Sequence, residues 1–187
     1  MLNTNLTNHF LISMPGMAND PMFGRSLVYL CDHSEQGALG IMINRPLEIT
    51  LKVLLEHAGQ ININPNLVNQ PVFLGGPVNM DHGYVLHRPV GNWTATLKIG
   101  DEMALTSSQD ILNDIAQDSF NGQFLVSLGF SGWGAGQLEQ ELAENTWLSV
   151  QALPSIIFDL PVEARFKAAM NHLGIDPGSL AEEAGHG

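Results

Sequence analysis

The sequence has little of what secreted or membrane-spanning proteins need. Its 187 residues include one cysteine, Cys31, so no disulfide can form within the chain, and a single thiol fits a reducing compartment. No apolar run approaches the roughly 20 residues that cross a bilayer as a helix. The segment MLNTNLTNHF lacks the basic and apolar stretches of a secretory signal. We therefore expect a cytoplasmic protein that does not enter a membrane.

Basic residues are also scarce. Seven lysines and arginines stand against nineteen acidic residues, which gives a formal net charge of −12. No basic residue lies between Lys98 and Arg165, an interval that holds ten acidic residues. Because proteins bind DNA through several lysine or arginine contacts to phosphate, this distribution predicts no direct binding of nucleic acid. The seven histidines show no metal-binding spacing, and we expect no metal and no other cofactor.

The chain does contain many short apolar runs bounded by turn residues. Ser26–Cys31 and Ala38–Ile43 indicate a hairpin, Thr50 is a candidate helix cap, and Ile156–Phe158 is a candidate strand. In total the patterns predict roughly eight or nine strands and four helices. Hairpins followed by strands that alternate with helices predict a mixed sheet in an α+β domain. We expect one domain over residues 1–187, with a frayed tail after about residue 176.

One glycine-rich stretch, Ser127–Leu148, stands out. We expect Phe124–Leu128 to form a strand and the next glycines to form a tight turn, because glycine alone takes positive φ without steric cost. Leu138 and Leu142 lie four residues apart, as on the buried face of a helix. The stretch therefore predicts a strand, a glycine turn and a helix.

The predicted turn supplies a candidate interaction loop. We expect at least one of Gly132 and Gly134 to have positive φ, and Trp133 to be partly exposed as an aromatic anchor for a partner. A phosphate-binding role fits poorly, since the stretch matches neither of the usual glycine-rich phosphate motifs. The candidate loop comprises Ser131, Gly132, Trp133, Gly134 and Gln137.

An enzyme is the alternative. Ser131 lies in the segment GFSGW, which resembles a nucleophile elbow except that Trp133 replaces the second glycine. Cys31 could act as a nucleophile or redox group, but it ends an apolar run beside Asp32, and this favours a buried, unreactive thiol. His33 and Trp93 are weaker candidates for a site. We favour a protein without catalytic residues and keep Cys31 or Ser131 as the enzyme alternative.

Several segments of the chain closely resemble the AlgH/YqgE family of small, largely uncharacterised bacterial proteins. They run from about residue 9 to about residue 175, and together they are very specific. The matching segments are Phe10–Pro15, Phe23–His33, Gly37–Pro46, Phe73–Val78, Gly91–Trp93, Leu105–Ser108, Gly129–Glu139 and Asn145–Leu148.

The resemblance implies one α+β domain whose mixed β-structure forms an open, barrel-like core with helices packed outside. The family takes its name from a proposed transcriptional regulator of alginate synthesis, and it supplies no catalytic or ligand-binding residues to carry over. Because the charge opposes DNA binding, a regulator of this kind would act indirectly. We therefore expect a regulatory or binding module with a protein or small-molecule partner.

Overall fold

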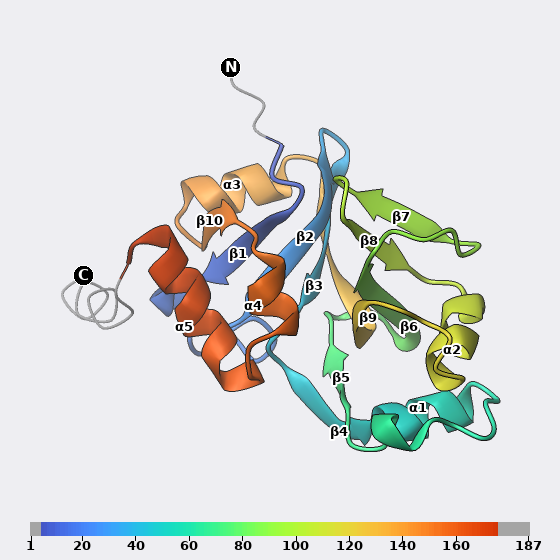
Figure 1. Ribbon diagram of the computed structural model, residues 1–187. Coiled ribbons are helices and arrows are strands. Elements are labelled where there is room, and N and C mark those ends of the chain that lie inside the picture. The colour runs from blue at the N-terminus through green and yellow to red at the C-terminus, as the bar shows by residue number, and fades with distance from the viewer. Residues whose placement is uncertain (1–4, 176–187) are drawn as a thin grey trace.

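The computed structural model describes residues 5–175 (Figure 1). Within this range lie ten strands, five α-helices and two short 3-10 turns, Pro15–Met17 and Pro65–Leu67. The strands are β1 (His9–Ser13), β2 (Leu27–Ser34), β3 (Gly37–Met42), β4 (Pro46–Thr50), β5 (Pro71–Leu74), β6 (Val78–Arg88), β7 (Thr96–Ile99), β8 (Met103–Thr106), β9 (Gln123–Gly134) and β10 (Trp147–Gln151). The helices are α1 (Leu51–His57), α2 (Gln109–Ala116), α3 (Gln137–Ala143), α4 (Pro154–Phe158) and α5 (Val162–Leu173).

All ten strands belong to one curled sheet. Its main order is β10-β1-β2-β3-β9-β6-β8-β7, and β4 pairs with β5, which in turn pairs with β9. The pairing of β5 with β9 is parallel and the others are antiparallel. The sheet forms an open half-barrel with helices outside it, as Figure 1 shows. The predicted α+β fold with an open, barrel-like core is confirmed.

The strand β9 separates three buried clusters of apolar side chains. Successive side chains of a strand point to opposite faces, so Leu125 packs in the cluster under α4 and α5, while Val126 packs in the cluster under α1 and α2. Further along the strand, Trp133 joins Leu138 of α3 in a third cluster. Each helix group thus covers a different part of the same curled sheet.

The predicted turn after Leu128 is wrong. Instead β9 continues to Gly134, and Gly132 and Gly134 pair with Leu39 and Gly37 of β3. Neither of these two glycines has positive φ, because extended pairing with β3 supplies hydrogen bonds that a turn would forgo. The chain reverses only at Ala135 and Gly136, where Gly136 has φ +77°.

A second glycine of the stretch also needs its backbone freedom. Gly129 has φ +76°, and it lies between Ser127 and Leu128, which pair with β5, and the residues from Ser131 onward, which pair with β3. A side chain there would also collide with the carbonyl oxygen of Gly76, since a Cβ would lie 2.4 Å from it. Gly129 therefore permits the bend at which the sheet curls.

The predicted strand Ile156–Phe158 is wrong because Pro154 begins α4, a position in which proline suits a helix. The expected cap of α1 is confirmed, since the Thr50 side chain accepts a hydrogen bond from Val53 N. The strand β4 was not anticipated. The tail after residue 176 lies outside the described residues. Within residues 5–175, no helix is both long enough and apolar enough to cross a membrane.

Candidate functional site

Trp133, the centre of the predicted interaction loop, is buried with 7% of its surface exposed. Its Nε1 donates to Glu141 Oε1 at 3.1 Å, and Trp147 Nε1 donates to the same oxygen at 3.0 Å. The two indole rings meet edge to face at 6.0 Å. The expectation of a partly exposed anchor is wrong, because β9 points this side chain toward α3 and Glu141 satisfies its only polar atom.

The other loop residues also make internal contacts. Gln137 Oε1 accepts from Gly134 N at 2.9 Å, and Gln137 Nε2 donates to Glu141 Oε2 at 2.9 Å. Ser131 is fully buried, and its hydroxyl donates to Gly75 O at 3.0 Å. The five predicted residues therefore lie along the end of β9 and the start of α3, where they join strand, helix and neighbouring backbone.

Neither candidate nucleophile forms a hydrogen bond with a histidine in the described part of the chain. Cys31 is buried, as the sequence predicts, and its thiol donates weakly to Tyr29 O at 3.7 Å. Burial raises the pKa of the Cys31 thiol, and Asp32 raises it further. A nucleophile needs a lowered pKa or an adjacent base. The contacts of Cys31 and Ser131 therefore give the enzyme alternative no support.

The two weaker candidates make their hydrogen bonds to different partners. His33 is buried, accepts from Leu6 N through Nδ1 at 3.0 Å, and donates through Nε2 to the Glu139 carboxylate. This hydrogen bond lowers the pKa of Glu139. Trp93 donates to Asp114 Oδ2 at 2.8 Å and packs against the ring of His87. Both side chains thus hold loops or helices against the sheet.

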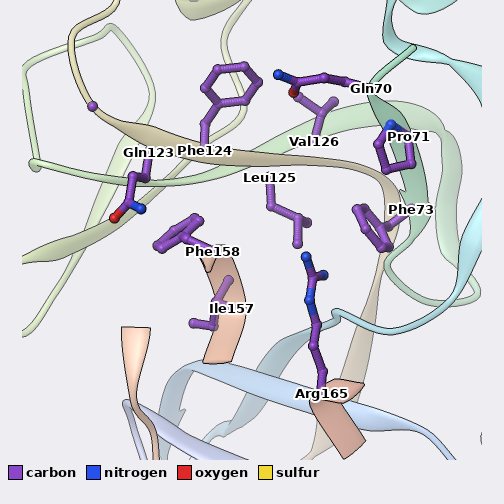
Figure 2. Close-up of a pocket in the computed structure, with 11 residues that line it drawn as sticks. Gln70, Pro71, Phe73, Gln123, Phe124, Leu125, Val126, Ile157, Phe158 and Arg165 are labelled. Carbon is purple, nitrogen blue, oxygen red and sulfur yellow. The ribbon is translucent and has the colours of Figure 1, made fainter. Parts of the chain in front are cut away.

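A cavity that sequence reasoning missed lies beside the other end of β9. The strands β5 and β9 pair only at Phe73 with Ser127 and at Leu74 with Leu128. Residues at the N-terminal ends of both strands line a space of about 310 Å³ (Figure 2). Residues of α4 and α5 complete its lining. We call it the Arg165 cavity; its lining residues are Gln70, Pro71, Phe73, Gly122, Gln123, Phe124, Leu125, Val126, Ile157, Phe158 and Arg165.

Arg165 is the only charged residue in that lining. It is 8% exposed, and in Figure 2 its side chain extends from α5 toward Leu125 and Phe73. Its Nη1 donates to Ile43 O at 2.6 Å and its Nε to Leu160 O at 3.2 Å. The guanidinium carbon lies 5.2 Å from the centre of the Phe73 ring, within reach of a cation–π contact.

The Arg165 guanidinium has no carboxylate partner among the described residues. Burial lowers its pKa, but an arginine side chain remains protonated in proteins. Two carbonyl dipoles and one aromatic face therefore offset the cost of burying a full positive charge. This arrangement leaves a net positive charge at the wall of the cavity.

A polar rim borders the cavity on the side of Gln123. Gln123 Oε1 accepts from Arg88 Nε at 2.6 Å, and its Nε2 donates to Asp159 Oδ1 at 2.8 Å. The Arg88 guanidinium lies over the Phe158 ring at 5.7 Å. Gly122 and Gln123 also line a second, shallower hollow of about 450 Å³ that includes Arg88, Pro89, Asp101 and Glu102. The two hollows are thus neighbours.

The sequence did contain a signal for Arg165. The predicted helix that ends at Gly174 has buried Ala169 and Met170 on one face, and Arg165 lies four residues before Ala169 on that face. Residues four apart share a face of a helix, so a charged side chain there is an exception to the apolar pattern. Such an exception marks either a paired charge or a site.

The fold defines a class of small α+β proteins, and comparisons with known proteins agree. A model of the family described as AlgH-like matches residues 10–178. The chain belongs to this family. It is 54% identical over 184 residues to a UPF0301 protein of Azoarcus sp. strain BH72, covering 98% of this chain and 97% of the relative. A UPF0301 protein of Nitrosospira multiformis is 50% identical over 187 residues, with both chains fully covered.

Solved structures show the same architecture. The solution structure of the AlgH protein from Pseudomonas aeruginosa matches with a TM-score of 0.81 and 42% identity, over 97% of this chain and 95% of that one. The crystal structure of protein DIP2367 from Corynebacterium diphtheriae matches with a TM-score of 0.72 at 19% identity, over 96% of this chain and 92% of that one. The second match concerns the fold alone.

Proposed function

We propose that the protein is a non-enzymatic binding module of the cytoplasm, and that its ligand is a small molecule held in the Arg165 cavity. The observation that carries the proposal is a buried guanidinium, without a carboxylate partner among the described residues, at the wall of a space lined with aromatic and aliphatic side chains. Ligand sites are mostly apolar hollows with a few convergent polar groups. The lone thiol of the chain supports the cytoplasm as the compartment.

The same residue offers a route from ligand binding to regulation. Arg165 ties α5 to the loop after β3 through its hydrogen bond to Ile43 O. A ligand that contacts the guanidinium would also alter this hydrogen bond, and with it the position of α5 against the sheet. We propose that a protein partner responds to that position. A net charge of −12 favours such an indirect role over direct contact with DNA.

A fragment screen by two-dimensional NMR tests the binding role. Backbone and side-chain amide resonances of the ¹⁵N-labelled protein are followed as small organic fragments are added. We expect shifts to cluster at Gln70, at Gln123–Val126 and at Ile157, which line the cavity. Shifts that cluster elsewhere, or none at millimolar fragment concentration, would overturn the proposal.

Two matched variants show whether the cavity itself binds. Leu125→Phe adds bulk to the cavity wall, whereas Leu138→Phe adds the same bulk to the cluster under α3. Both overpack the core, at a cost of about 1–3 kcal/mol. We expect only Leu125→Phe to abolish the fragment shifts. Equal retention in both variants would place binding outside the cavity.

A further inference from the structure

We infer that the ligand of the Arg165 cavity carries one carboxylate on a compact apolar body, and that the carboxylate binds the Arg165 guanidinium. The inference rests on the proposed function, because it names the ligand class of the same cavity. Three observations carry it: the free donors of Arg165, the charge of the surrounding residues, and the size and lining of the space.

The Arg165 guanidinium lines the cavity and keeps a donor that has no partner among the described residues. Nε and Nη1 donate to backbone carbonyls, whereas Nη2 has no hydrogen-bond partner among the described residues. No fully buried side-chain nitrogen or oxygen in that range lacks a partner, so Nη2 is reached by solvent although the residue as a whole is buried. A buried arginine with a solvent-reached donor is suited to hold an anion, since charge-assisted hydrogen bonds to guanidinium are strong.

The charges nearby favour a single negative charge on the ligand. One anion neutralises Arg165, which has no carboxylate within ion-pair distance among residues 5–175; the Glu163 carboxylate acts on it from a greater distance and raises its pKa. Asp159 already holds the rim through Gln123, and Asp101 and Glu102 line the adjoining hollow against the one cation of Arg88. A second negative charge, as on a phosphate monoester or a dicarboxylate, would meet this acidic surround. A monocarboxylate avoids that repulsion.

The space and its lining favour a compact apolar body. A volume of about 310 Å³ is at the lower end of the range for ligand sites, roughly 300–1,000 Å³. Phe73, Leu125, Ile157 and Phe158 supply apolar walls beside the guanidinium. Burial of a ring or short alkyl chain against these walls would supply the hydrophobic part of the affinity.

Matched pairs of probes test the inference on the wild-type protein. Benzoate is compared with benzamide, and hexanoate with hexanamide, by titration of the cavity amide shifts. Within each pair the body is alike and only the charge differs. We expect the carboxylate to bind at least tenfold more tightly than the amide in at least one pair. Phenyl phosphate, titrated alongside, is expected to bind more weakly than benzoate.

Variants test whether Arg165 causes the preference for carboxylate over amide. Arg165→Met removes the cation, and we expect it to abolish the preference for carboxylate over amide while the amide still binds. Arg45→Met is the control, because Arg45 also donates to backbone carbonyls, those of Pro21, Met22 and Gly24, but does not line the cavity. It should keep the preference. Should Arg165→Met not fold, Arg165→Lys, which keeps the charge, is expected to retain part of the preference.

The possible results distinguish the inferred carboxylate ligand from the proposed binding role of the cavity. Equal binding of carboxylate and amide by the wild type would overturn the inference while the proposed binding role stands. No binding of any probe in the cavity would overturn both. Tighter binding of phenyl phosphate than of benzoate would replace carboxylate by phosphate as the ligand group. Loss of the preference in Arg45→Met as well would show that Arg165 is not its source.

Discussion

The buried polar side chains beside the two halves of β9 differ in whether all their hydrogen-bonding groups have partners. Beyond the bend at Gly129, the carboxylate of Glu141 accepts hydrogen bonds from two indoles and one amide, and the side chains of Trp133 and Trp147 are buried. Before the bend, the Arg165 guanidinium faces a cavity with a donor to spare. A saturated cluster stabilises the fold, whereas an unsaturated one beside open space can accept a ligand. The candidate site therefore belongs to the first half.

Replacing Trp133 is the strongest test of the saturated half. Trp133→Ala should reduce the free energy of unfolding by about 3–5 kcal/mol, because it removes a buried aromatic side chain. Urea denaturation measures the change, and Trp133→Phe, which retains most of the ring, should cost less. A loss of under about 1 kcal/mol for Trp133→Ala would mean that this half is not closely packed.

The next largest loss of stability is expected at Gly129, the bend between the two halves of β9. Gly129→Ala should destabilise the protein by about 2 kcal/mol, because φ is +76° there and the added Cβ would lie 2.4 Å from Gly76 O. Gly132→Ala is the matched control, since its Cβ would meet its nearest neighbour at 3.5 Å, and it should change stability by no more than about 0.5 kcal/mol. Thermal unfolding of both variants compares them; equal losses would contradict the assignment of the bend to Gly129.

A smaller effect should come from His87, which pairs with Phe124 beside the first half of β9. Burial lowers the pKa of His87, while the hydrogen bond to Pro89 O opposes this shift. The unfolded chain therefore takes up a proton at this residue at a higher pH than the folded chain does, so stability should fall as pH drops below about 6.5. The expected slope is at most about 1.4 kcal/mol per pH unit.

Replacing His87 tests whether this residue is the source of the slope. His87→Gln should flatten the dependence of unfolding free energy on pH between about 7 and 5. Chemical denaturation at several pH values measures the wild type and the variant. An unchanged slope in His87→Gln would show that this side chain takes up its proton equally in the folded and unfolded chains.

Local patterns predicted the parts of the fold that local physics decides. Leu138 was expected on a helix face, and it is buried in α3; Thr50 was expected as a cap, and it caps α1. The number of glycines in β9 led to the wrong prediction of a turn. Their conformation is decided by pairing with β3, which lies more than ninety residues earlier in the chain. Short apolar runs are ambiguous for the same reason, as Ile156–Phe158 shows.

The candidate site could not be predicted from the sequence, for a related reason. Trp133 was singled out by its glycine neighbours, but exposure depends on which element covers a strand, here α3. Arg165 could be recognised as a charge on an apolar helix face, yet Phe73, Leu125 and Phe158 come from three other elements. Only the tertiary fold shows that these side chains meet around one cavity.

The central place of β9 also governs the order in which the protein can assemble during synthesis. β9 joins β3, β5 and β6, which are all made before it, and none of these three pairs directly with another. A nascent chain that has not yet released Gln123–Gly134 from the ribosome therefore presents three unpaired strand edges, and such edges invite pairing with other chains. Because β9 supplies the partner for all three edges, none of the three strands can complete its pairing until Gln123–Gly134 has been made.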